Sequence, residues 1–371
     1  MVLSRLADTT NTSLNLGLLC TMMDDTDVWD DPEGDDLIAS VQLDSTKCLS
    51  VEDQPPLFKY RGGRVYVSDL SSQMYCEQKL LYSLIGVRRL REMGYDIEEG
   101  ESAQVTAGTN IHLARALEIQ DVVSVSTITR EDNVAVSLLN LLGAVRALLS
   151  GVPVVREVPV FGMSFGGDIF VNGIIDEIRC DAETLQIDIV ELKTRASATP
   201  PSKCVRETHH LQVMVYGHLL RNLIQGQVKM TDLVKGFRVN RDVKFSSGVL
   251  EYMSPSERSL DDLRLLVPVV LETIQALPLP ANLIVEYYSQ EKNCSLSYEG
   301  VNYDEGWLID RFEKLLPFWK GERPAEGVQD IEEVWKCRRC EFQNFCEWRL
   351  AKECQCVEQN SKWFRGVVQP P

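Results

Sequence analysis

Three residues near the ends of two neighbouring apolar segments carry the clearest chemistry in this sequence. Asp176 lies inside the run Val171–Ile178, and Glu191 and Lys193 stand at the end of the run Leu185–Leu192. Both runs are rich in Ile and Val and are separated by a short polar stretch, which predicts two buried strands joined as a hairpin. Because residues two apart on a strand face the same side, Glu191 and Lys193 share a face, and the hairpin brings Asp176 beside them.

Two carboxylates on a buried hairpin need a cation to compensate their charge. Oxygen ligands suit Mg²⁺ or Mn²⁺, so we predict that Asp176, Glu191 and the Leu192 carbonyl hold such an ion. Lys193 then positions or activates an attacking water, while the ion lowers the pKa of that water and stabilises developing negative charge. This combination indicates phosphodiester hydrolysis. On the pattern alone, a solvent-facing hairpin in which Lys193 pairs with Glu191 explains the residues equally well.

Two predicted helices add further polar side chains. Gln212 and Tyr216 are four residues apart in the helix that follows Lys193, and therefore share one helix face. They are candidates to hold DNA or to orient Lys193. His112 lies upstream in a helix predicted over Thr109–Ile119. Taken singly, each of these three residues is an ordinary helix residue, so their interpretation depends on the wider pattern.

A second strong signal lies near the C-terminus, where Cys337, Cys340 and Cys346 follow a C-x₂-C-x₅-C pattern. Cysteines this close together in an intracellular protein favour a metal site over a disulfide. Three thiolates need a fourth ligand, which Cys354 or Cys356 could supply. Both zinc and an iron–sulfur cluster use such ligands, and the spacing does not decide between them.

Taken together, these motifs resemble a known nuclease family. The chain resembles the eukaryotic exonuclease V family, an iron–sulfur, RecB-like branch of the PD-(D/E)xK nuclease superfamily. The resemblance covers about Tyr60 to Trp348. The matching stretches are Val67-Ser-Asp-Leu with Cys76-Glu, Gly108-Thr-Asn-Ile-His-Leu-Ala-Arg, Arg156-Glu-Val-Pro-Val-Phe-Gly, Gly173-Ile-Ile-Asp-Glu, Glu191-Leu-Lys-Thr-Arg, the Gln212-x-x-x-Tyr216 helix and Trp335-Lys-Cys.

The resemblance implies an α/β fold with a PD-(D/E)xK restriction-endonuclease-like core, in which helices flank a mixed sheet. Helical additions and a four-cysteine cluster would join the N- and C-terminal parts of the domain. Carried over by position, the expected [4Fe–4S] ligands are Cys76, Cys337, Cys340 and Cys346. The expected metal ligands are His112, Asp176 and Glu191, and the expected catalytic set is Asp176, Glu191, Lys193, Gln212 and Tyr216.

The activity that the resemblance implies is a Mg²⁺-dependent exonuclease specific for single-stranded DNA, which releases short oligonucleotides from free ends in DNA repair and genome maintenance. The expected partners are single-stranded DNA and, as a candidate, a single-strand DNA-binding protein. The enzyme is expected to be a monomer. It is expected in the nucleus and cytoplasm, and a mitochondrial pool is left open. Two alternatives use the same residues: a zinc-stapled, non-catalytic nucleic-acid-binding adaptor, and a structure-specific endonuclease or flap nuclease. Polarity of digestion stays undetermined.

Composition sets limits on these interpretations. The chain has 371 residues and a formal net charge of −17, of which residues 1–60 carry −9 through 12 acidic and 3 basic residues. Residues 1–55 are therefore expected to form an acidic, disordered tail. The resemblance implies a nuclease domain over residues 60–350 and leaves residues 351–371 as a flexible tail. No apolar run reaches the roughly 18 residues of a membrane helix, and no Walker A motif appears, so neither a membrane span nor an ATP-driven motor is expected.

The remaining elements follow from periodicity and capping signals. Val65-Tyr-Val predicts a strand that leads, with Ser68 or Asp69 as N-cap, into a helix running through Cys76 to about Leu84. An apolar strand is expected at Val152–Phe161; Glu157 interrupts it and is assigned with equal weight to the site or to the surface. The other expected elements are helices over Glu131–Leu149, Leu260–Ala276 and Glu305–Trp319, and a last core strand at Leu233–Asn240 or Ile284–Tyr288.

Overall fold

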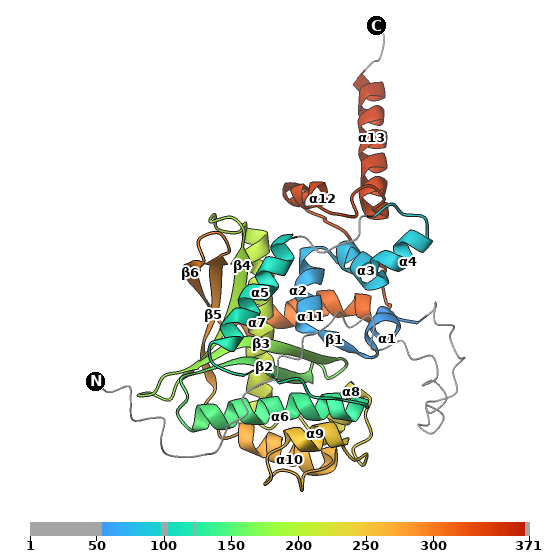
Figure 1. The fold of residues 1–371 in the computed structure, drawn as a ribbon. Coiled ribbons are helices and arrows are strands. Elements are labelled where there is room, and N and C mark those ends of the chain that lie inside the picture. The colour runs from blue at the N-terminus through green and yellow to red at the C-terminus, as the bar shows by residue number, and fades with distance from the viewer. Residues whose placement is uncertain (1–53, 98–102, 122, 368–371) are drawn as a thin grey trace.

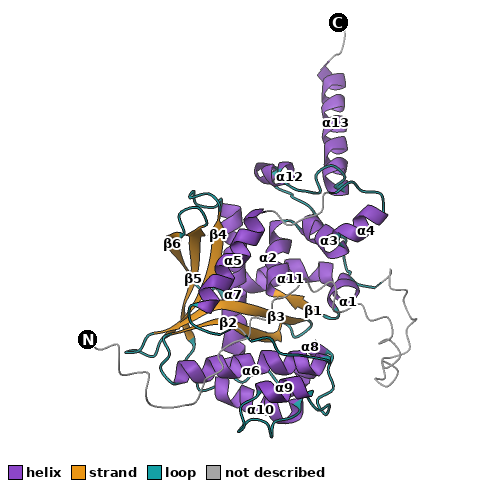
Figure 2. Ribbon diagram, in the orientation of Figure 1, coloured by secondary structure: helices purple, strands orange, loops and turns teal. Residues whose placement is uncertain are grey.

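The computed structural model describes residues 54–97, 103–121 and 123–367, and its centre is a six-stranded mixed sheet flanked by helices (Figure 2). The strands are β1 (Arg64–Tyr66), β2 (Val154–Met163), β3 (Phe170–Cys180), β4 (Ile187–Arg195), β5 (Pro280–Ser289) and β6 (Cys294–Val301). They run in the order β1-β3-β4-β5-β6, and β2 also pairs with β3. The β1–β3 and β4–β5 pairs are parallel and the others antiparallel. The α/β fold class predicted from the sequence is confirmed.

Helices cover both faces of this sheet and build a separate lobe at one end (Figure 1). They are α1 (Pro56–Arg61), α2 (Val67–Tyr75), α3 (Glu77–Ile85), α4 (Val87–Glu92), α5 (Ala103–Leu117), α6 (Arg130–Leu149), α7 (Lys203–Ile224), α8 (Met230–Phe237), α9 (Ser247–Tyr252), α10 (Leu263–Ile274), α11 (Glu305–Trp319), α12 (Trp335–Arg338) and α13 (Glu347–Val367). The α3, α4 and α12 helices lie together with the start of α13, whose remainder extends away from the body of the molecule.

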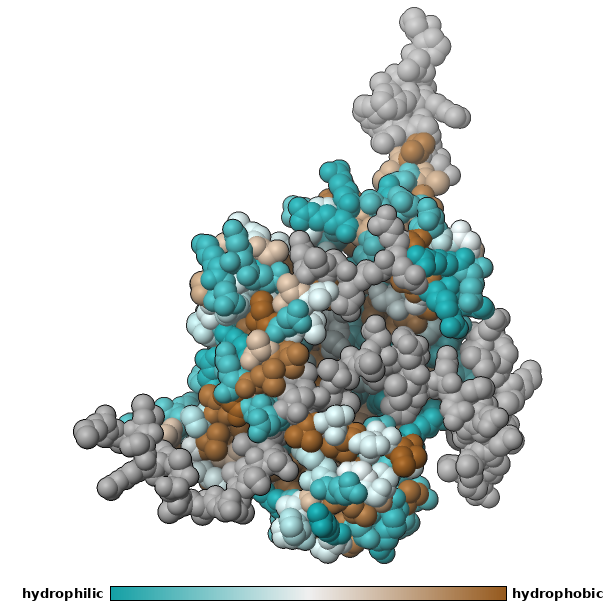
Figure 3. Space-filling view, viewed as in Figure 1, coloured by the Kyte–Doolittle hydropathy of each residue, from teal (hydrophilic) through white to brown (hydrophobic). Residues whose placement is uncertain are grey.

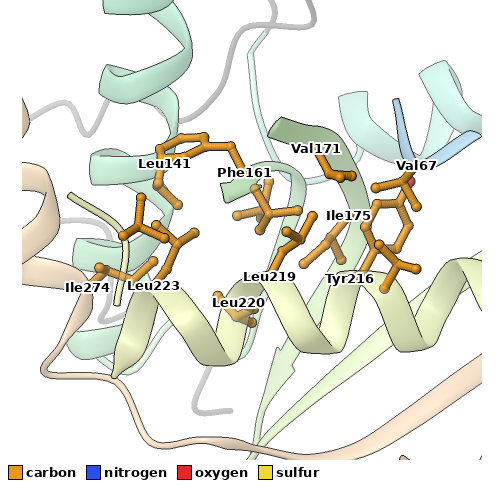
Figure 4. Packing of buried hydrophobic residues seen from close by; sticks show 14 of the residues in the cluster. Val67, Leu141, Phe161, Val171, Ile175, Tyr216, Leu219, Leu220, Leu223 and Ile274 are labelled. Atoms are coloured by element: carbon orange, nitrogen blue, oxygen red, sulfur yellow. The ribbon is translucent and has the colours of Figure 1, made fainter. Parts of the chain in front are cut away.

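The central helix α7 is buried along most of its length because apolar residues occupy nearly every side of it. Figure 4 shows Tyr216 and Leu219 of α7 packing towards Phe161 of β2 and Ile175 of β3. α6 packs against β2 and α10 in the same core. Within the described residues, α6 is the one helix long and apolar enough to cross a membrane, but 67% of that window is buried inside the fold.

Side chains along β4 and β5 point alternately to the two faces of the sheet, and each face is covered by a different helix. Lys193 and its neighbour Tyr287 face α7, where Gln212 and His209 bond to them. Thr194 of the next position faces α5 instead, since a Cβ added at Gly108 of α5 would lie 2.7 Å from its hydroxyl oxygen. α7 and α5 therefore cover opposite faces of the same two strands.

β3 and β4 separate where the candidate catalytic residues begin. Their register ends at Glu177 opposite Val190, and its continuation would place Asp176 opposite Glu191. Instead, Asp176 Oδ2 accepts a hydrogen bond of 2.7 Å from the Leu192 amide. A side chain thus replaces a rung of the ladder, and the two strands diverge around the pair of carboxylates. The predicted hairpin is confirmed, and its open end is the feature that positions the site.

Several expected elements differ in the structure. The helix predicted to run through Cys76 is broken there, because Cys76 has an extended backbone (φ −167°) between α2 and α3. The N-cap of α2 is Tyr66 rather than Ser68 or Asp69; Asp69 instead accepts from the Tyr66 amide at 3.1 Å. These changes turn the Cys76 side chain out of a continuous helix face and towards the C-terminal segment.

The fold also decides between the two candidates for the last core strand. Of the two candidates for the last core strand, Ile284–Tyr288 lies in β5, whereas Leu233–Asn240 falls largely in helix α8. The stretch from residue 351, expected as a flexible tail, continues α13 as far as Val367. The acidic stretch of residues 1–53 lies outside the described residues. The strand β6 was not expected, because its alternation of polar residues carries little apolar signal.

Gly173 allows α2 and α7 to approach β3, and this gives a stability prediction. A Cβ at Gly173 would lie 2.8 Å from both the Tyr216 ring and a Val67 methyl group. We expect Gly173→Ala to lower the free energy of unfolding by about 1–3 kcal/mol, because this core cannot accept the added methyl without moving both side chains. Urea denaturation measures the loss.

Gly300→Ala is the matched control, since nothing lies within 4 Å of a Cβ at that strand position. It should leave stability unchanged or raise it slightly by restricting the unfolded chain. Equal midpoints for the two variants would contradict the packing argument.

Candidate active site

Asp176, Glu191 and Lys193 meet at the open end of the β3–β4 hairpin, as the sequence predicted. Lys193 Nζ lies 2.7 Å from Glu191 Oε1, and the Glu191 side chain is only 3% exposed. Asp176 is held by the Leu192 amide described above, so its second oxygen stays available. The three groups form one cluster with two acidic charges and one basic charge.

The Gln212–Tyr216 pair of α7 fixes the position of Lys193. Gln212 Oε1 accepts a hydrogen bond of 2.7 Å from Lys193 Nζ. The amide nitrogen of Gln212 donates to Tyr216 Oη at 3.2 Å, which sets the orientation of the amide. Of the roles left open by the sequence, orienting Lys193 is therefore the one that these contacts fit. Two of the three ammonium protons are directed in this way, at Glu191 and at Gln212.

His112 reaches the cluster from α5, on the other face of the sheet. Its Nδ1 atom lies 3.6 Å from Asp176 Oδ1. It reaches Asp176 at the place where β3 and β4 have separated, so the open hairpin end gives both sheet faces access to the same carboxylate. Burial lowers the pKa of His112, which favours the neutral imidazole that a metal ion binds.

Glu157 of β2 is the residue whose role the sequence left open, and the structure places it beside this cluster. Potential ligand atoms of His112, Glu157 and Asp176 all lie within 4.8 Å of one another. Glu157 stands between two β2 residues that pair with Glu177 and Ile175, directly across from Asp176. Its φ of +53° is a strained value for a residue with a side chain. The sequence signal was an acid inside an apolar strand, which alone does not distinguish a site from a surface.

Burial raises the pKa values of all three carboxylates, and neighbouring negative charges add to the effect. Burial, followed by the charges of Asp176 and Glu191, raises the pKa of Glu157 to about 8. Burial raises the pKa of Asp176 to about 6 and, together with the charge of Asp176, that of Glu191 to about 7. Lys193 opposes both of the latter shifts. The cluster therefore has too little positive charge of its own to hold all three groups ionised at neutral pH.

The donor set fits a divalent cation. Glu191 Oε2 is buried and has no hydrogen-bond partner, which leaves a carboxylate oxygen without compensation. The neighbouring donors are carboxylate oxygens and one imidazole nitrogen, a combination that suits Mg²⁺ or Mn²⁺. The predicted ligands His112 and Asp176 are brought together; Glu157 joins them more closely than the predicted third ligand, Glu191, which is occupied on one side by Lys193.

The four predicted cluster cysteines also come together, at the far end of α2. Cys76, Cys337, Cys340 and Cys346 line one small cavity, and Tyr82 and Phe342 contribute its apolar wall. Cys76 is separated from the other three by more than 250 positions of sequence. Burial raises the pKa values of the Cys76, Cys337 and Cys340 thiols, and neighbouring cysteines raise them further. A metal centre would relieve this by binding the thiolates. Cys354 and Cys356 are exposed on α13 and do not line the cavity.

A small hydrophobic cluster separate from the main core supports this lobe. It consists of Tyr82, Leu90, Ile97 and Phe342, with Tyr95, Phe345 and the side chains of Cys340 and Cys346 packed against it. Tyr95 stacks on Phe345 with ring centroids 4.3 Å apart. So few apolar residues bury a limited area, and lobes of this size commonly rely on a metal centre for stability.

Comparison with known proteins identifies the family. The family model described as exonuclease V, a 5′ deoxyribonuclease, matches residues 56–185, 179–264 and 253–349. The chain belongs to the exonuclease V family. It is similar to exonuclease V of Danio rerio, with 33% identity over 308 residues that cover 82% of this chain and 75% of that protein. As a family member it is a nuclease, a hydrolase of nucleic-acid phosphodiesters.

A solved structure, the crystal structure of SSO0001, is also similar. It covers 77% of this chain and 87% of its own, with a TM-score of 0.37 and 13% sequence identity. Likeness at this level carries no argument about function, so the family assignment rests on sequence and the site on its own geometry.

The raised pKa of Glu157 gives a pH-dependent stability prediction. A carboxyl whose pKa rises from 4.5 to about 8 on folding stabilises the fold fully below pH 4.5 and loses that contribution as the pH rises to about 8. Glutamine mimics the protonated form at every pH. We therefore expect Glu157→Gln in chelator to gain stability relative to the wild type across this interval, measured by thermal denaturation.

Glu251→Gln provides the matched control, because Glu251 is an exposed glutamate on α9. Added Mg²⁺ should reduce the advantage of Glu157→Gln, because the cation then offsets the negative charges. A difference between Glu157→Gln and wild type that stays constant with pH would contradict the burial of this carboxyl.

Proposed function

We propose that this chain is a metal-dependent exonuclease that hydrolyses single-stranded DNA from 5′ ends, with a structural [4Fe–4S] cluster in its C-terminal lobe. The observation that carries the proposal is the group formed by buried Glu191 with partly buried Asp176 and Lys193 at the open end of the hairpin. Family membership supplies the polarity, because the family model is described as a 5′ deoxyribonuclease.

The side chains divide the chemical work. His112, Asp176, Glu157 and Glu191 would hold the Mg²⁺ ion or ions. A bound Mg²⁺ lowers the pKa of a coordinated water and offsets charge on the scissile phosphate. Lys193, held by Glu191 and Gln212, keeps one ammonium proton for the substrate or the attacking water.

The recessed position of these groups supports single-strand specificity. The side chains of His112, Asp176, Glu191 and Lys193 are exposed by 30%, 18%, 3% and 23%. A flexible single strand can bend its phosphates into such a site more easily than a stiff duplex. Lys203 and Arg206 at the start of α7 are more exposed, at 85% and 42%, and lie close along the chain after β4, where they can contact the DNA backbone.

The spread of the cysteines supports an iron–sulfur cluster over zinc. A tetrahedral zinc ion with Zn–S bonds of about 2.3 Å holds its sulfur atoms about 3.8 Å apart. Among the described residues, the group of three or more potential ligands within 4.8 Å of one another is the one at the active site. The four cysteines line one cavity without forming such a group, which fits a larger cluster better than a single zinc ion. The zinc-stapled adaptor is the less well supported alternative.

DNA repair is the proposed context, with a single-strand DNA-binding protein as a candidate partner and a monomer as the working form. A nuclear and cytoplasmic distribution suits this role, and fractionation of cells that express a tagged chain would reveal a mitochondrial pool. These proposals rest on the family resemblance and on the DNA substrate.

Digestion of end-labelled linear single-stranded DNA with Mg²⁺ tests the activity. We expect Lys193→Ala to lower the cleavage rate roughly 100-fold or more, because the ammonium that stabilises the transition state is lost. DNA binding, measured in Ca²⁺ or chelator by fluorescence anisotropy, should change little. The exposed Lys292 in the β5–β6 turn gives the matched control, and Lys292→Ala should cleave as the wild type does.

Substrate ends distinguish the related activities. A 5′ exonuclease should leave circular single-stranded DNA intact and should be blocked by a bulky 5′ group more than by a 3′ group. Cleavage of circles would favour the endonuclease alternative. No cleavage by iron-loaded wild type with either Mg²⁺ or Mn²⁺ would refute the enzymatic proposal.

The proposed cluster predicts that Cys337→Ala loses iron, stability and activity together. Removing one ligand should destabilise the cluster, which would otherwise connect Cys76 to the small C-terminal lobe. Iron content and absorbance near ~400 nm measure the first effect, and thermal denaturation the second. Cys354→Ala, on exposed α13, is the control and should keep its iron. An iron-free Cys337→Ala protein with full activity would contradict the structural role.

A further inference from the structure

α5 contributes one residue to the site, His112, and is held on the sheet by few contacts. From Val105 to Leu117, Gly108 and Ala116 are the positions that are buried. Apolar side chains near its C-terminal end face solvent, with Leu117 exposed by 54% and Ile119 by 40%; Figure 3 shows hydrophobic surface in this region. Burial of apolar area therefore does little to fix this helix against β4 and β5.

Polar contacts at the end of the helix fix it instead. Arg115 donates to both carboxylate oxygens of Glu286 on β5, at 3.0 and 2.6 Å. The Glu286 side chain is 0% exposed, so this two-point ion pair lies in a poorly hydrated place. The Arg115 guanidinium also lies over the Tyr288 ring, 4.8 Å from its centroid. Two hydrogen bonds and one stacked face leave Arg115 a single orientation.

A neighbouring arginine holds the backbone of the same turn. Arg156 of β2 donates a hydrogen bond to the Arg115 carbonyl and bonds Glu177 of β3 at 2.9 Å. Arg179 lies between Glu177 and Glu286 and links the two carboxylates. The end of α5 is therefore attached to β2, β3 and β5 through alternating charges. At the other end, Gly108 rests directly on Thr194.

We propose that Arg115 is a positioning residue for the active site, acting through His112. The two residues are three apart and share one side of α5. Any rotation or shift of the helix that breaks the Arg115–Glu286 pair also moves the imidazole away from Asp176, from which it is now 3.6 Å distant. The inference rests on the proposed metal site. It states that an ion pair on the opposite face of the sheet fixes the position of the metal ligand His112.

The geometry explains why an ion pair is used here. A helix held by apolar packing can slide by small steps, because such contacts have no direction. A two-point guanidinium–carboxylate pair has one good geometry, and separating it would leave the buried Glu286 charge without its main partner. The imidazole is thereby fixed to the accuracy that a metal ligand needs.

Nuclear magnetic resonance of the histidines tests the positioning without any metal. The chain has four histidines, of which His209, His210 and His218 lie on α7 and serve as internal references. In metal-free protein we expect Arg115→Met to shift the ring resonances of His112, identified by their loss in His112→Ala, and to leave the other three in place. Unchanged His112 resonances would overturn the proposal, and so would equal shifts in all four.

A double-mutant cycle on Mn²⁺ binding gives the second test. Measured by calorimetry, Arg115→Met should weaken Mn²⁺ binding roughly tenfold, as is typical for a residue that orients a metal ligand. In the His112→Ala background the same change should alter Mn²⁺ affinity less than about twofold, because the imidazole that Arg115 positions is absent. Equal losses in both backgrounds would overturn the proposal. If His112→Ala itself binds Mn²⁺ as wild type does, the assigned metal site fails instead, and the positioning role with it.

Two further variants separate positioning from stability. Arg115→Met combined with Glu286→Met removes both charges, avoids a buried unpaired carboxylate and should restore stability while Mn²⁺ binding stays weak. Recovery of wild-type affinity in this folded double variant would overturn the proposal. The control is Arg146→Met, because Arg146 of α6 forms an ion pair with Glu257 that involves no residue of the site. It should lower the melting temperature without changing Mn²⁺ affinity.

Discussion

The separation of β3 from β4 is the constraint on which the rest of the structure depends. Beyond Glu177 and Val190 the strands no longer pair, and Asp176 takes over the Leu192 amide with its side chain. A regular ladder would have directed the Leu192 amide at a backbone carbonyl and left no opening. The divergence therefore creates both the acidic cluster and the route by which α5, from the other face, reaches it. Burial of three carboxylates is the consequence, and a cation is the simplest compensation.

α2 links the cysteine lobe to this site. At its first residue, Val67 touches the position of Gly173 on β3, together with Tyr216 of α7. At its far end stands Cys76, which faces the three C-terminal cysteines. The chain returns to this point more than 250 residues later, and Lys336 then donates to the Tyr75 carbonyl at 3.1 Å. A structural cluster here would fix the end of a helix whose start packs behind the catalytic strands.

Buried polar contacts strengthen the same connection. Glu77, 5% exposed at the start of α3, accepts from Arg323 at 2.9 Å and from the Glu326 amide at 2.8 Å. Trp319 of α11 donates to Gln73 of α2 at 2.8 Å. Each buried group has its partner in the other half of the chain, so the N- and C-terminal parts of the domain are tied by directional bonds as well as by the cysteines. This specificity holds the lobe in one place despite its small apolar core.

The sequence by itself determined the chemistry and most of the elements. Short-range patterns did this. Asp176, Glu191 and Lys193 lie on two neighbouring strands of one hairpin, Gln212 and Tyr216 are one helical turn apart, and three cysteines are closely spaced. It could not determine what depends on contacts between distant segments. The break at Cys76, the arrival of Glu157 opposite Asp176, and the attachment of α5 through Arg115 and Glu286 all involve partners that no local pattern connects. Only the tertiary structure decided these, because strand register and helix seating are set by packing across the whole sheet.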